Sequence, residues 1–450
     1  MAQDTIVLYP SPGKGHIFSM IELANTITKH HPSISVTIII LTSPDDTTNY
    51  SSPTPSIKFV HLPAVPLPAA VFSSFKDVVA SFFEFPELNN DNLHQALTEL
   101  SNSTNIKALV IDFFCNSAVD VSSSLNIPIY YYYTCNATAL CCLLYWPTID
   151  KNVAEGFKVV DIPGAPRRLS SEDLPLVMLE RSHRVYDYFI DTANQMAKSA
   201  GIILNSFQSL EPRAVKALVE GNCTPDSPIP PIYFVGPVVS IRKEEHECLS
   251  WLDSQPSRSV VFLCFGSMGV LPPSQLKEIA IALEKSEVTF LWIVRKPQTN
   301  DESTLESFLP EGFLERTENR GSVVNSWAPQ AAVLNHDSVG VFVSHCGWNS
   351  ILESVLAGVP MLAWPLYAEQ KMNAKLLVEE MKLALSVTRS ENGSVSASEL
   401  ELRLNEIMNT EIGKVIRKNV GEMRAAAVNA VSDGGSSLVD LSQLVDSFTV

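Results

Sequence analysis

The sequence has few basic residues for its length, and this shortage excludes two classes of partner. It contains 32 lysines and arginines against 49 aspartates and glutamates, so its formal net charge at pH 7 is −17. A chain with this balance repels both the phosphates of nucleic acids and anionic lipid headgroups. We therefore expect neither nucleic acid nor a membrane surface among its partners.

Paired cysteine motifs are also missing. The eight cysteines include no C-x-x-C pair and no spacing typical of metal ligands. This pattern predicts free, buried thiols in a reducing compartment and no metal site. The opening residues, MAQDTIVLYP, carry an acid where a secretory signal would carry positive charge. We expect a cytoplasmic protein and a monomer.

No apolar run is long enough to suggest a membrane span. The most apolar stretch, Ile129 to Trp146, contains the polar residues Thr134, Asn136 and Thr138 and is closed by Pro147. A helix that crosses a bilayer needs about 20 predominantly apolar residues. The stretch is better explained as a buried strand followed by a helix, and we expect no stable membrane insertion.

Hydrophobic residues are nevertheless abundant, at 46% of the 450 residues. A chain of this length exceeds what one hydrophobic core supports, so we expect two domains of roughly 200 residues each. Both halves alternate apolar strands with helices, which predicts doubly wound α/β domains with parallel sheets. A proline-rich stretch from Thr224 to Pro237, followed by the charged segment 242–247, marks the approach to the boundary.

A glycine-containing turn lies between the first predicted strand, 6–9, and its helix, 17–29. His16 follows this turn, at the carboxyl end of the sheet, where open α/β sheets bind ligands. It is a candidate general base there, although a structural or exposed histidine is the alternative. The pair Gly13-x-Gly15 resembles the start of a dinucleotide-binding fingerprint, but the third glycine and the acid after the second strand are absent.

An acidic residue follows another apolar strand, because Asp112 comes directly after the segment 108–111. A lone aspartate at such a position is commonly a helix cap or turn residue. Beside His16, at a neighbouring strand end, it could hold the tautomer of the imidazole and stabilise the imidazolium. His16 and Asp112 are therefore a candidate catalytic pair.

The most specific pattern runs from Trp327 to Gln370 and reads WAPQAAVLNHDSVGVFVSHCGWNSILESVLAGVPMLAWPLYAEQ. A strand over 339–344 leads into His345 to Ser350, which open a helix whose free N–H groups and positive dipole end suit a diphosphate. In length and spacing the segment closely resembles the 44-residue signature box of plant family 1 UDP-glycosyltransferases. Within that family the chain resembles the branch that glucosylates flavonoids, isoflavones and chalcones.

The resemblance implies an α/β protein with the GT-B fold, in which two facing Rossmann-like domains enclose a cleft. Residues 1–238 would bind the acceptor and residues 239–432 the UDP-sugar, while 433–450 would form a C-terminal helix that packs back on the first domain. His16 would be the base and Asp112 its partner. No cofactor or metal is implied, because the UDP-sugar is a co-substrate.

The resemblance also assigns the donor site. Trp327 would stack on uracil, Glu353 would bind the ribose, and residues around His345 would hold the diphosphate. The candidate donor-binding residues are Thr134, Ser267, Trp327, Ala328, Gln330, His345, Gly347, Trp348, Asn349, Ser350, Glu353, Glu369 and Gln370. Trp364, which is flanked by apolar residues, is interpreted as a core residue, whereas Trp327 and Trp348 are not.

The acceptor pocket is expected to be apolar and aromatic. Its candidate residues are Phe82, Phe83, Phe85, Phe113, Phe114 and Tyr367. These residue types accept many flat polyphenols, so the acceptor and the choice between O- and C-glycosylation stay open. For the donor, the box holds no arginine that would pair with the carboxylate of UDP-glucuronate, and the family associates a terminal glutamine such as Gln370 with glucose.

These patterns together predict an inverting, metal-independent hexosyltransferase that moves glucose from UDP-glucose to a small phenolic. Two other classes of function are weighed against it. A nicotinamide-dependent oxidoreductase would use Gly13-x-Gly15 but would leave the second half of the chain unexplained. A non-catalytic small-molecule binding protein would tolerate the loss of the base and of the phosphate donors, and all of these residues are present.

Overall fold

The structure is a computed structural model that describes residues 3–44, 50, 54–66, 74–240, 245–297 and 304–448. It divides into two compact units. Unit 1 comprises Met1–Ser240 and Asn429–Val450, and unit 2 comprises Ile241–Val428. The chain therefore returns to unit 1 at its C-terminal end. Residues 241–244, in and beside the charged segment expected near the boundary, lie outside the described residues.

Unit 1 contains a parallel sheet of seven described strands in the order β3-β2-β1-β4-β5-β8-β9. All six residues of β2 are buried, as expected for a parallel strand covered on both faces. The strands are β1 (Gln3–Tyr9), β2 (Ser35–Ile40), β3 (Ile57–His61), β4 (Thr104–Asp112), β5 (Ile129–Tyr133), β8 (Gly201–Leu204) and β9 (Ile232–Phe234).

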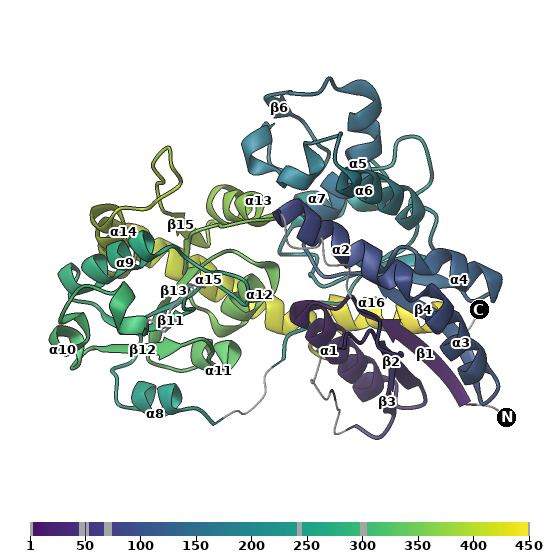
Figure 1. Cartoon of the computed structure of the whole chain (residues 1–450), viewed down its shortest axis with the longest axis horizontal. Helices are drawn as coiled ribbons and strands as arrows, with labels where there is room; N and C mark the ends of the chain where they lie inside the picture. The colour runs from purple at the N-terminus through teal and green to yellow at the C-terminus, as the bar shows by residue number, and fades with distance from the viewer. Residues whose placement is uncertain are drawn as a thin grey trace. The chain divides into compact units, whose positions relative to one another are not determined.

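One face of this sheet is covered by the first and last helices of the chain. Helix α1 (Lys14–His30) and helix α16 (Ser436–Ser447) share a hydrophobic core with the inner residues of β1, β2, β4 and β5. Helix α16, yellow in Figure 1, is anchored by Asp440, whose Oδ2 accepts from the Phe234 N–H at 2.9 Å. Ser437 donates to the Gly236 carbonyl at 2.6 Å. The last helix is therefore an integral part of unit 1.

The remaining helices of unit 1 pack among themselves and against the sheet. They are α2 (Phe75–Leu88), α3 (Asn90–Ser101), α4 (Ala118–Ser124), α5 (Ala137–Asn152), α6 (Arg184–Met196) and α7 (Pro212–Val219), beside a short antiparallel pair, β6 (Val159–Val160) and β7 (Leu169–Ser170). Pro147 lies inside α5 instead of closing the apolar stretch at its end. The helix is buried along most of its length, and this packing outweighs the hydrogen bond that the proline removes.

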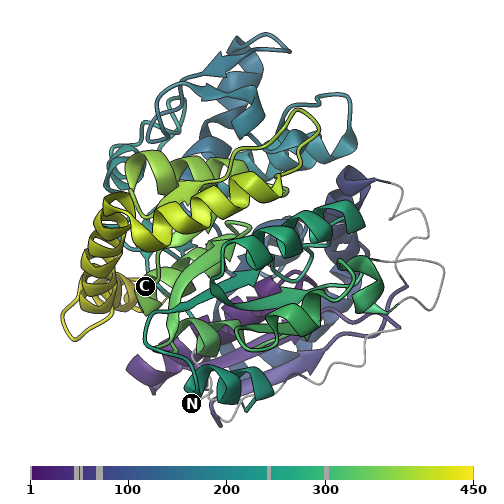
Figure 2. The ribbon, with the colours of Figure 1, turned by 90° about the vertical axis from the view of Figure 1, so that its left-hand side faces the viewer.

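Unit 2 repeats the arrangement with six described parallel strands in the order β12-β11-β10-β13-β14-β15, surrounded by helices (Figure 2). The strands are β10 (Val260–Cys264), β11 (Thr289–Val294), β12 (Gly321–Asn325), β13 (Val339–Ser344), β14 (Met361–Ala363) and β15 (Ala384–Ser386). The helices are α8 (Glu247–Asp253), α9 (Pro273–Lys285), α10 (Phe313–Thr317), α11 (Gln330–Leu334), α12 (Trp348–Ala357), α13 (Gln370–Lys375), α14 (Ala397–Asn409) and α15 (Glu411–Ala430). Helices α9 and α14 share one core with β10.

The two sheets reverse their strand order at equivalent places. In unit 1 the reversal lies between β1 and β4, and in unit 2 it lies between β10 and β13. Connections leave such neighbours toward opposite faces of the sheet, so the loops at their carboxyl ends diverge and leave room for a ligand. The prediction of two doubly wound α/β domains is confirmed, and each candidate site residue can be located relative to these two points.

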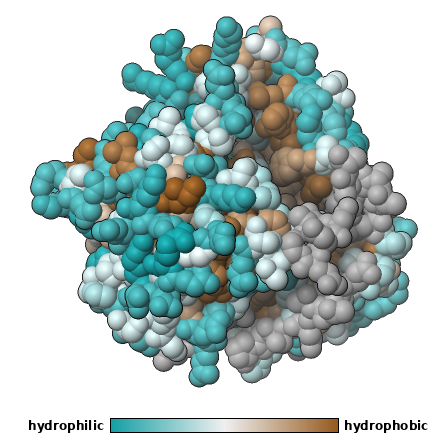
Figure 3. Space-filling view, turned by 60° about the vertical axis from the view of Figure 1, so that its left-hand side comes forward, coloured by the Kyte–Doolittle hydropathy of each residue, from teal (hydrophilic) through white to brown (hydrophobic). Residues whose placement is uncertain are grey.

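The surface gives no sign of a membrane-spanning segment. Among the described residues, no helix combines the length and the apolar character needed to cross a bilayer. On the face drawn in Figure 3, hydrophilic residues cover most of the coloured surface, and hydrophobic residues form small, separate groups.

Candidate active site

His16 and Asp112 meet at the strand reversal of unit 1. His16 lies in the first turn of α1, and its Nδ1 atom is 2.8 Å from Oδ2 of Asp112, the last residue of β4. The second carboxylate oxygen of Asp112 accepts from the Phe114 N–H at 3.1 Å. Thr134, expected near the sugar, lies with its Oγ1 3.3 Å from the same His16 nitrogen. Two residues far apart in sequence are thus brought together by neighbouring parallel strands.

The burial of this pair sets its chemistry. The Asp112 side chain is fully buried, whereas 27% of the His16 side chain is exposed. A buried carboxylate beside Nδ1 favours the tautomer that carries its proton on Nδ1, which leaves the lone pair of the neutral ring on Nε2. A Cβ atom at Gly13 would lie 3.0 Å from His16 Cδ2, so a larger residue there would crowd the His16 ring. The arrangement can hold an imidazole in the form that accepts a proton at Nε2.

Aromatic side chains surround this histidine. The Phe114 ring meets His16 edge to face, with centroids 5.4 Å apart, and the Phe82 ring lies 5.3 Å from Phe114. Phe82 and Phe114 keep partly exposed surface, whereas Phe83 and Phe113 are buried behind them. Phe85 is also fully buried. Of the phenylalanines predicted for the acceptor pocket, Phe82 and Phe114 therefore offer the accessible surface.

Two further aromatic residues of this cluster were not predicted. Tyr188 stacks on Phe83 with centroids 5.0 Å apart, and Phe189 meets Phe113 at 5.2 Å, both from α6. The only signal in the sequence is a helical segment with aromatic residues on one side, which is also what a buried helix shows. Their contribution depends on the packing of α2 against α6, which the sequence does not reveal.

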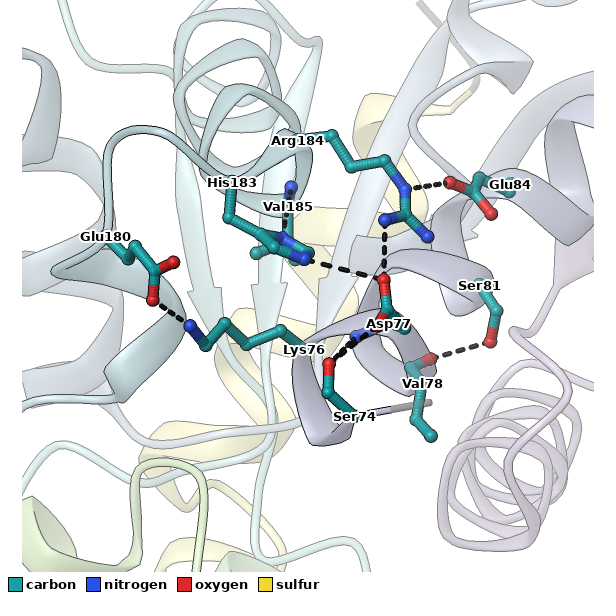
Figure 4. Close-up of polar contacts among 10 residues, drawn as sticks. All are labelled: Ser74, Lys76, Asp77, Val78, Ser81, Glu84, Glu180, His183, Arg184 and Val185. Carbon is teal, nitrogen blue, oxygen red and sulfur yellow. Dashed lines mark hydrogen bonds and ion pairs between the residues drawn. The ribbon is translucent and has the colours of Figure 1, made fainter. Parts of the chain in front are cut away.

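Charged residues join α2 to the start of α6 and to the segment that precedes it, as Figure 4 shows. Arg184 donates to Asp77 at 2.6 Å and to Glu84 at 2.7 Å. His183 lies 3.5 Å from the same Asp77 oxygen, and Lys76 pairs with Glu180. We call this network the α2–α6 clamp. Because Arg184 is about half exposed, each pair is worth little alone, but the network fixes one helix against the other.

In unit 2 the strand reversal has, after β13, a turn without any charged side chain. After β13, Cys346 adopts a left-handed backbone conformation with φ of 65°, and its N–H donates to Ser344 Oγ at 3.1 Å. Gly347 then caps α12. A Cβ atom at Gly266 or Gly347 would come within 2.6 Å or 2.5 Å of the His345 ring. The two glycines therefore make room for this ring beside the start of the helix.

His345 is a buried and neutral histidine. Burial lowers the pKa of His345 to about 4, so the ring is neutral near pH 7. Its Nδ1 atom is buried and has no hydrogen-bond partner within the part of the chain that the structure describes. A buried polar atom of this kind indicates a missing partner, such as a ligand or water. The turn can thus offer a neutral imidazole and the N-terminal dipole of α12 to an anion.

Several predicted donor residues of unit 2 lie together. Gln330 Nε2 donates to Ser350 Oγ at 2.8 Å and to Glu353 Oε2 at 2.6 Å. Burial raises the pKa of Glu353 to about 7, against the opposing effect of the Gln330 hydrogen bond. Trp327 is 53% exposed and meets the His246 ring edge to face at 5.8 Å. An exposed indole near paired polar groups can bind a flat base and its ribose.

Gln370 and Glu369 follow the last strand-end turn of the box. The Gln370 side chain is buried, and its Oε1 accepts from the N–H groups of Leu366 and Tyr367 at 2.9 and 3.0 Å. The Nε2 amino group of the same side chain can then donate to a ligand. Asn373, which was not predicted, donates to the Cys346 carbonyl at 2.9 Å and contacts Glu369 at 3.4 Å. Asn373 thereby links the turn after β13 to the turn that carries Glu369.

The chain matches a known family over the end of unit 1 and nearly all of unit 2. Residues 197–425 match the family described as "UDP-glucoronosyl and UDP-glucosyl transferase". UDP-glycosyltransferase 88B1 of Stevia rebaudiana is 48% identical, with all of both chains covered. Anthocyanidin 5,3-O-glucosyltransferase of a Rosa hybrid cultivar is 46% identical, covering 99% of this chain and 98% of that one.

Solved structures agree. The UGT71G1 structure from Medicago truncatula complexed with UDP-glucose has a TM-score of 0.89 at 35% identity, covering 100% of this chain and 99% of that one. A UDP-glucosyltransferase from Polygonum tinctorium has a TM-score of 0.93 at 34% identity, with both chains fully covered. The chain belongs to this family. The predictions of a plant family 1 UDP-glycosyltransferase, of the GT-B fold and of an enzyme of the UDP-glucosyltransferase class are confirmed.

One interpretation of the glycosyltransferase sequence needs correction. Trp348 is only 3% exposed, so it is a core residue at the start of α12, unlike the exposed Trp327. Trp364 is buried as expected. Outside the box, Arg295 donates to the Gly266 carbonyl at 3.2 Å.

Proposed function

We propose that this enzyme transfers glucose from UDP-glucose to a hydroxyl group of a flavonoid, isoflavone or chalcone-like phenolic, with inversion at the anomeric carbon. The observation that carries this proposal is the 2.8 Å contact between His16 Nδ1 and Asp112 Oδ2 at the strand reversal of unit 1. In this proposal unit 1 binds the acceptor and unit 2 binds the donor.

The proposed chemistry uses the neutral histidine as a base. His16 Nε2 removes the phenol proton while the phenol oxygen attacks C1 of glucose from the face opposite to UDP. The bond from C1 to the diphosphate oxygen breaks, and UDP leaves with that electron pair. Buried Asp112 stabilises the imidazolium that forms. An α-linked donor then gives a β-linked product.

The donor half of the proposal rests on the turn after β13. The start of α12 would present backbone N–H groups to the diphosphate, and His345 would supply a neutral ring. Ser267 is exposed and Asn349 is partly exposed, so both are accessible to a ligand. Trp327 would stack on uracil, and Gln330 and Glu353 would bind the ribose. Since these groups offset the diphosphate charge, no divalent cation is required in this proposal.

The acceptor half rests on the aromatic cluster. Phe82 and Phe114 present flat, partly exposed surface beside His16, which suits a planar polyphenol. The names of relatives support this class, because they include an isoflavone 7-O-glucosyltransferase of Glycine max and a phloretin 2'-O-glucosyltransferase of Malus domestica. We expect a free phenolic hydroxyl to be the reacting group.

A product analysis tests the proposal. The enzyme is incubated with UDP-glucose and, separately, with a flavonoid, an isoflavone and a chalcone, and the products are resolved by mass and by the anomeric coupling constant. We expect a β-O-glucoside and stoichiometric UDP from at least one of them. Release of UDP without a glycoside, or an α-linked product, would contradict the proposed mechanism.

A further inference from the structure

A separate pocket lies within unit 2, beside the candidate donor residues but made of different side chains. It has a volume of about 430 Å³, which is in the range of sites for small organic molecules. Its lining comes from the segments 268–275, 364–367 and 389–394. Ser267 directly precedes the first segment, and Tyr367 belongs to the second. Apart from Tyr367, no residue that lines this pocket has a role in the proposed reaction.

Arg389 is the only charged residue that lines this pocket. Its Nε and Nη2 atoms are buried, and neither has a hydrogen-bond partner within the described ranges. Burial lowers the pKa of Arg389 from its ordinary value, which expresses the unfavourable removal of the charge from water. A guanidinium in this situation lacks the acceptor that normally compensates for its desolvation. The pocket therefore has an unmatched positive charge on its wall.

The loop that follows Arg389 is held in place by hydrogen bonds. Gln275 donates to the Val395 carbonyl at 2.8 Å and accepts from the Val395 N–H at 2.9 Å. The Ser390 N–H donates to the Ser394 carbonyl at 2.9 Å, which closes the turn between them. A fixed loop loses little entropy when a ligand binds.

The other walls of the pocket are of mixed character. Apolar side chains such as Leu271 and Leu366 line it together with polar ones such as Gln275 and Asn392, and Trp364 is itself buried. Such a lining suits a small organic molecule that carries both polar and apolar groups. Because the whole chain carries a net charge of −17, an anion would collect here only through a specific local contact.

We infer that this pocket binds a small organic carboxylic acid, with its carboxylate paired to Arg389 and its carbon skeleton between the mixed walls. This site goes beyond the proposed transfer reaction. The acid is either the carboxylate-bearing part of an acceptor or a separate small molecule. Planar pairing between a carboxylate and a guanidinium is specific, so the neutral ester of the same acid should bind much more weakly.

Calorimetric binding to the full-length enzyme tests the inference without any turnover, so its failure is distinct from failure of the proposed function. The probes are 4-coumarate and methyl 4-coumarate, titrated into the wild type, Arg389→Gln and Arg316→Gln. Arg316 is an exposed residue of unit 2 and controls for the loss of one positive charge. We expect 4-coumarate to bind the wild type and Arg316→Gln alike, and Arg389→Gln about 10- to 100-fold more weakly.

Thermal unfolding provides the second readout. Nε and Nη2 of Arg389 have no hydrogen bond to lose among the described residues, so Arg389→Gln should unfold at the wild-type temperature or above it. 4-Coumarate should raise the melting temperature of the wild type and of Arg316→Gln, but not that of Arg389→Gln. A large loss of stability in the variant would show a structural role and overturn the inference. Equal affinity of the wild type for 4-coumarate and its methyl ester would also overturn it. The same holds if Arg389→Gln weakens the binding of UDP-glucuronate but not that of 4-coumarate.

Kinetics with a neutral phenolic acceptor then identify the source of the acid. If 4-coumarate raises the KM of that acceptor, the pocket belongs to the acceptor site. If 4-coumarate binds through Arg389 without changing this KM, the pocket takes a separate molecule. Both results support a carboxylate site at Arg389.

Discussion

Two histidines lie at the strand reversals of the two units and differ in their surroundings. His16 follows β1 and His345 follows β13, each at a strand reversal. His16 is partly exposed and hydrogen-bonded to a carboxylate, whereas His345 is buried with no carboxylate at its Nδ1 within the described residues. The topology therefore determines where a functional side chain lies, and its neighbours determine what it does. In the proposed mechanism one histidine takes a proton, whereas the other remains neutral.

Removing the paired histidine should give the largest effect. His16→Ala should lower kcat by about 10²- to 10⁴-fold, because general base catalysis contributes that much and the acceptor proton then has no receiver. UDP should still bind with wild-type affinity, since the donor residues proposed above lie in unit 2. Steady-state kinetics with a phenolic acceptor and calorimetry with UDP measure the two quantities. A variant that keeps wild-type kcat would disprove the role of His16.

Asp112→Asn sharpens the same prediction. The amide can donate where the carboxylate accepts, so the tautomer of His16 is no longer fixed and kcat should fall in the same direction. The pH dependence of kcat/KM should also change, which a purely structural effect on folding would not produce. If Asp112→Asn unfolds without changing the kinetics of the folded fraction, Asp112 serves stability alone.

How far the sequence predicts such a site depends on the range of the interaction. The strand 339–344 and the helix start at Trp348 follow from local patterns and match β13 and α12. The His16–Asp112 contact follows from strand ends, because neighbouring parallel strands bring their carboxyl ends together. The burial of Trp348 and the contribution of Tyr188 depend on how helices pack, which no local pattern encodes. Contacts that a residue outside a motif makes with it, such as the hydrogen bond from Arg295 to the Gly266 carbonyl, cannot be predicted for the same reason.

The room around His345 gives the next prediction. In Gly347→Ala the new Cβ atom would lie 2.5 Å from His345 Nε2, so the ring or the start of α12 must move. We expect the Kd for UDP to rise by about 10-fold or more, because phosphate-binding N–H groups tolerate little displacement. Gly421→Ala is the matched control, since nothing lies within 4 Å of its Cβ position. Equal UDP affinity in both variants would show that the turn does not bind the diphosphate.

The buried groups of unit 2 should also oppose each other in pH-dependent stability. The unfolded chain protonates His345 below about pH 6.5, whereas burial lowers its folded pKa to about 4, so stability is lost as pH falls across this window. Burial raises the pKa of Glu353 to about 7 from an ordinary value near 4.5, so stability is lost as pH rises across that window. Each effect is worth about 3 kcal/mol at most.

Urea unfolding between pH 4.5 and 7.5 separates the two effects. The stability of the wild type should fall relative to His345→Gln as pH decreases below 6.5. It should fall relative to Glu353→Gln as pH increases above 4.5. Parallel stability curves for the wild type and either variant would show that the corresponding side chain titrates normally in the folded state.

The smallest expected effect is that of metal removal, and it follows from the contrast between the two histidines. In unit 2 the proposed diphosphate partners are the N–H groups at the start of α12 and the neutral ring of His345, so the diphosphate charge is met by dipoles and hydrogen bonds. Excess EDTA should therefore leave kcat and the KM for UDP-glucose unchanged, and added Mg²⁺ should change neither constant. Activity lost on chelation and restored by Mg²⁺ or Mn²⁺ would show that a cation bridges the diphosphate. In that case the buried, neutral state of His345 would have to serve the packing of Gly266 and Gly347 instead of donor binding.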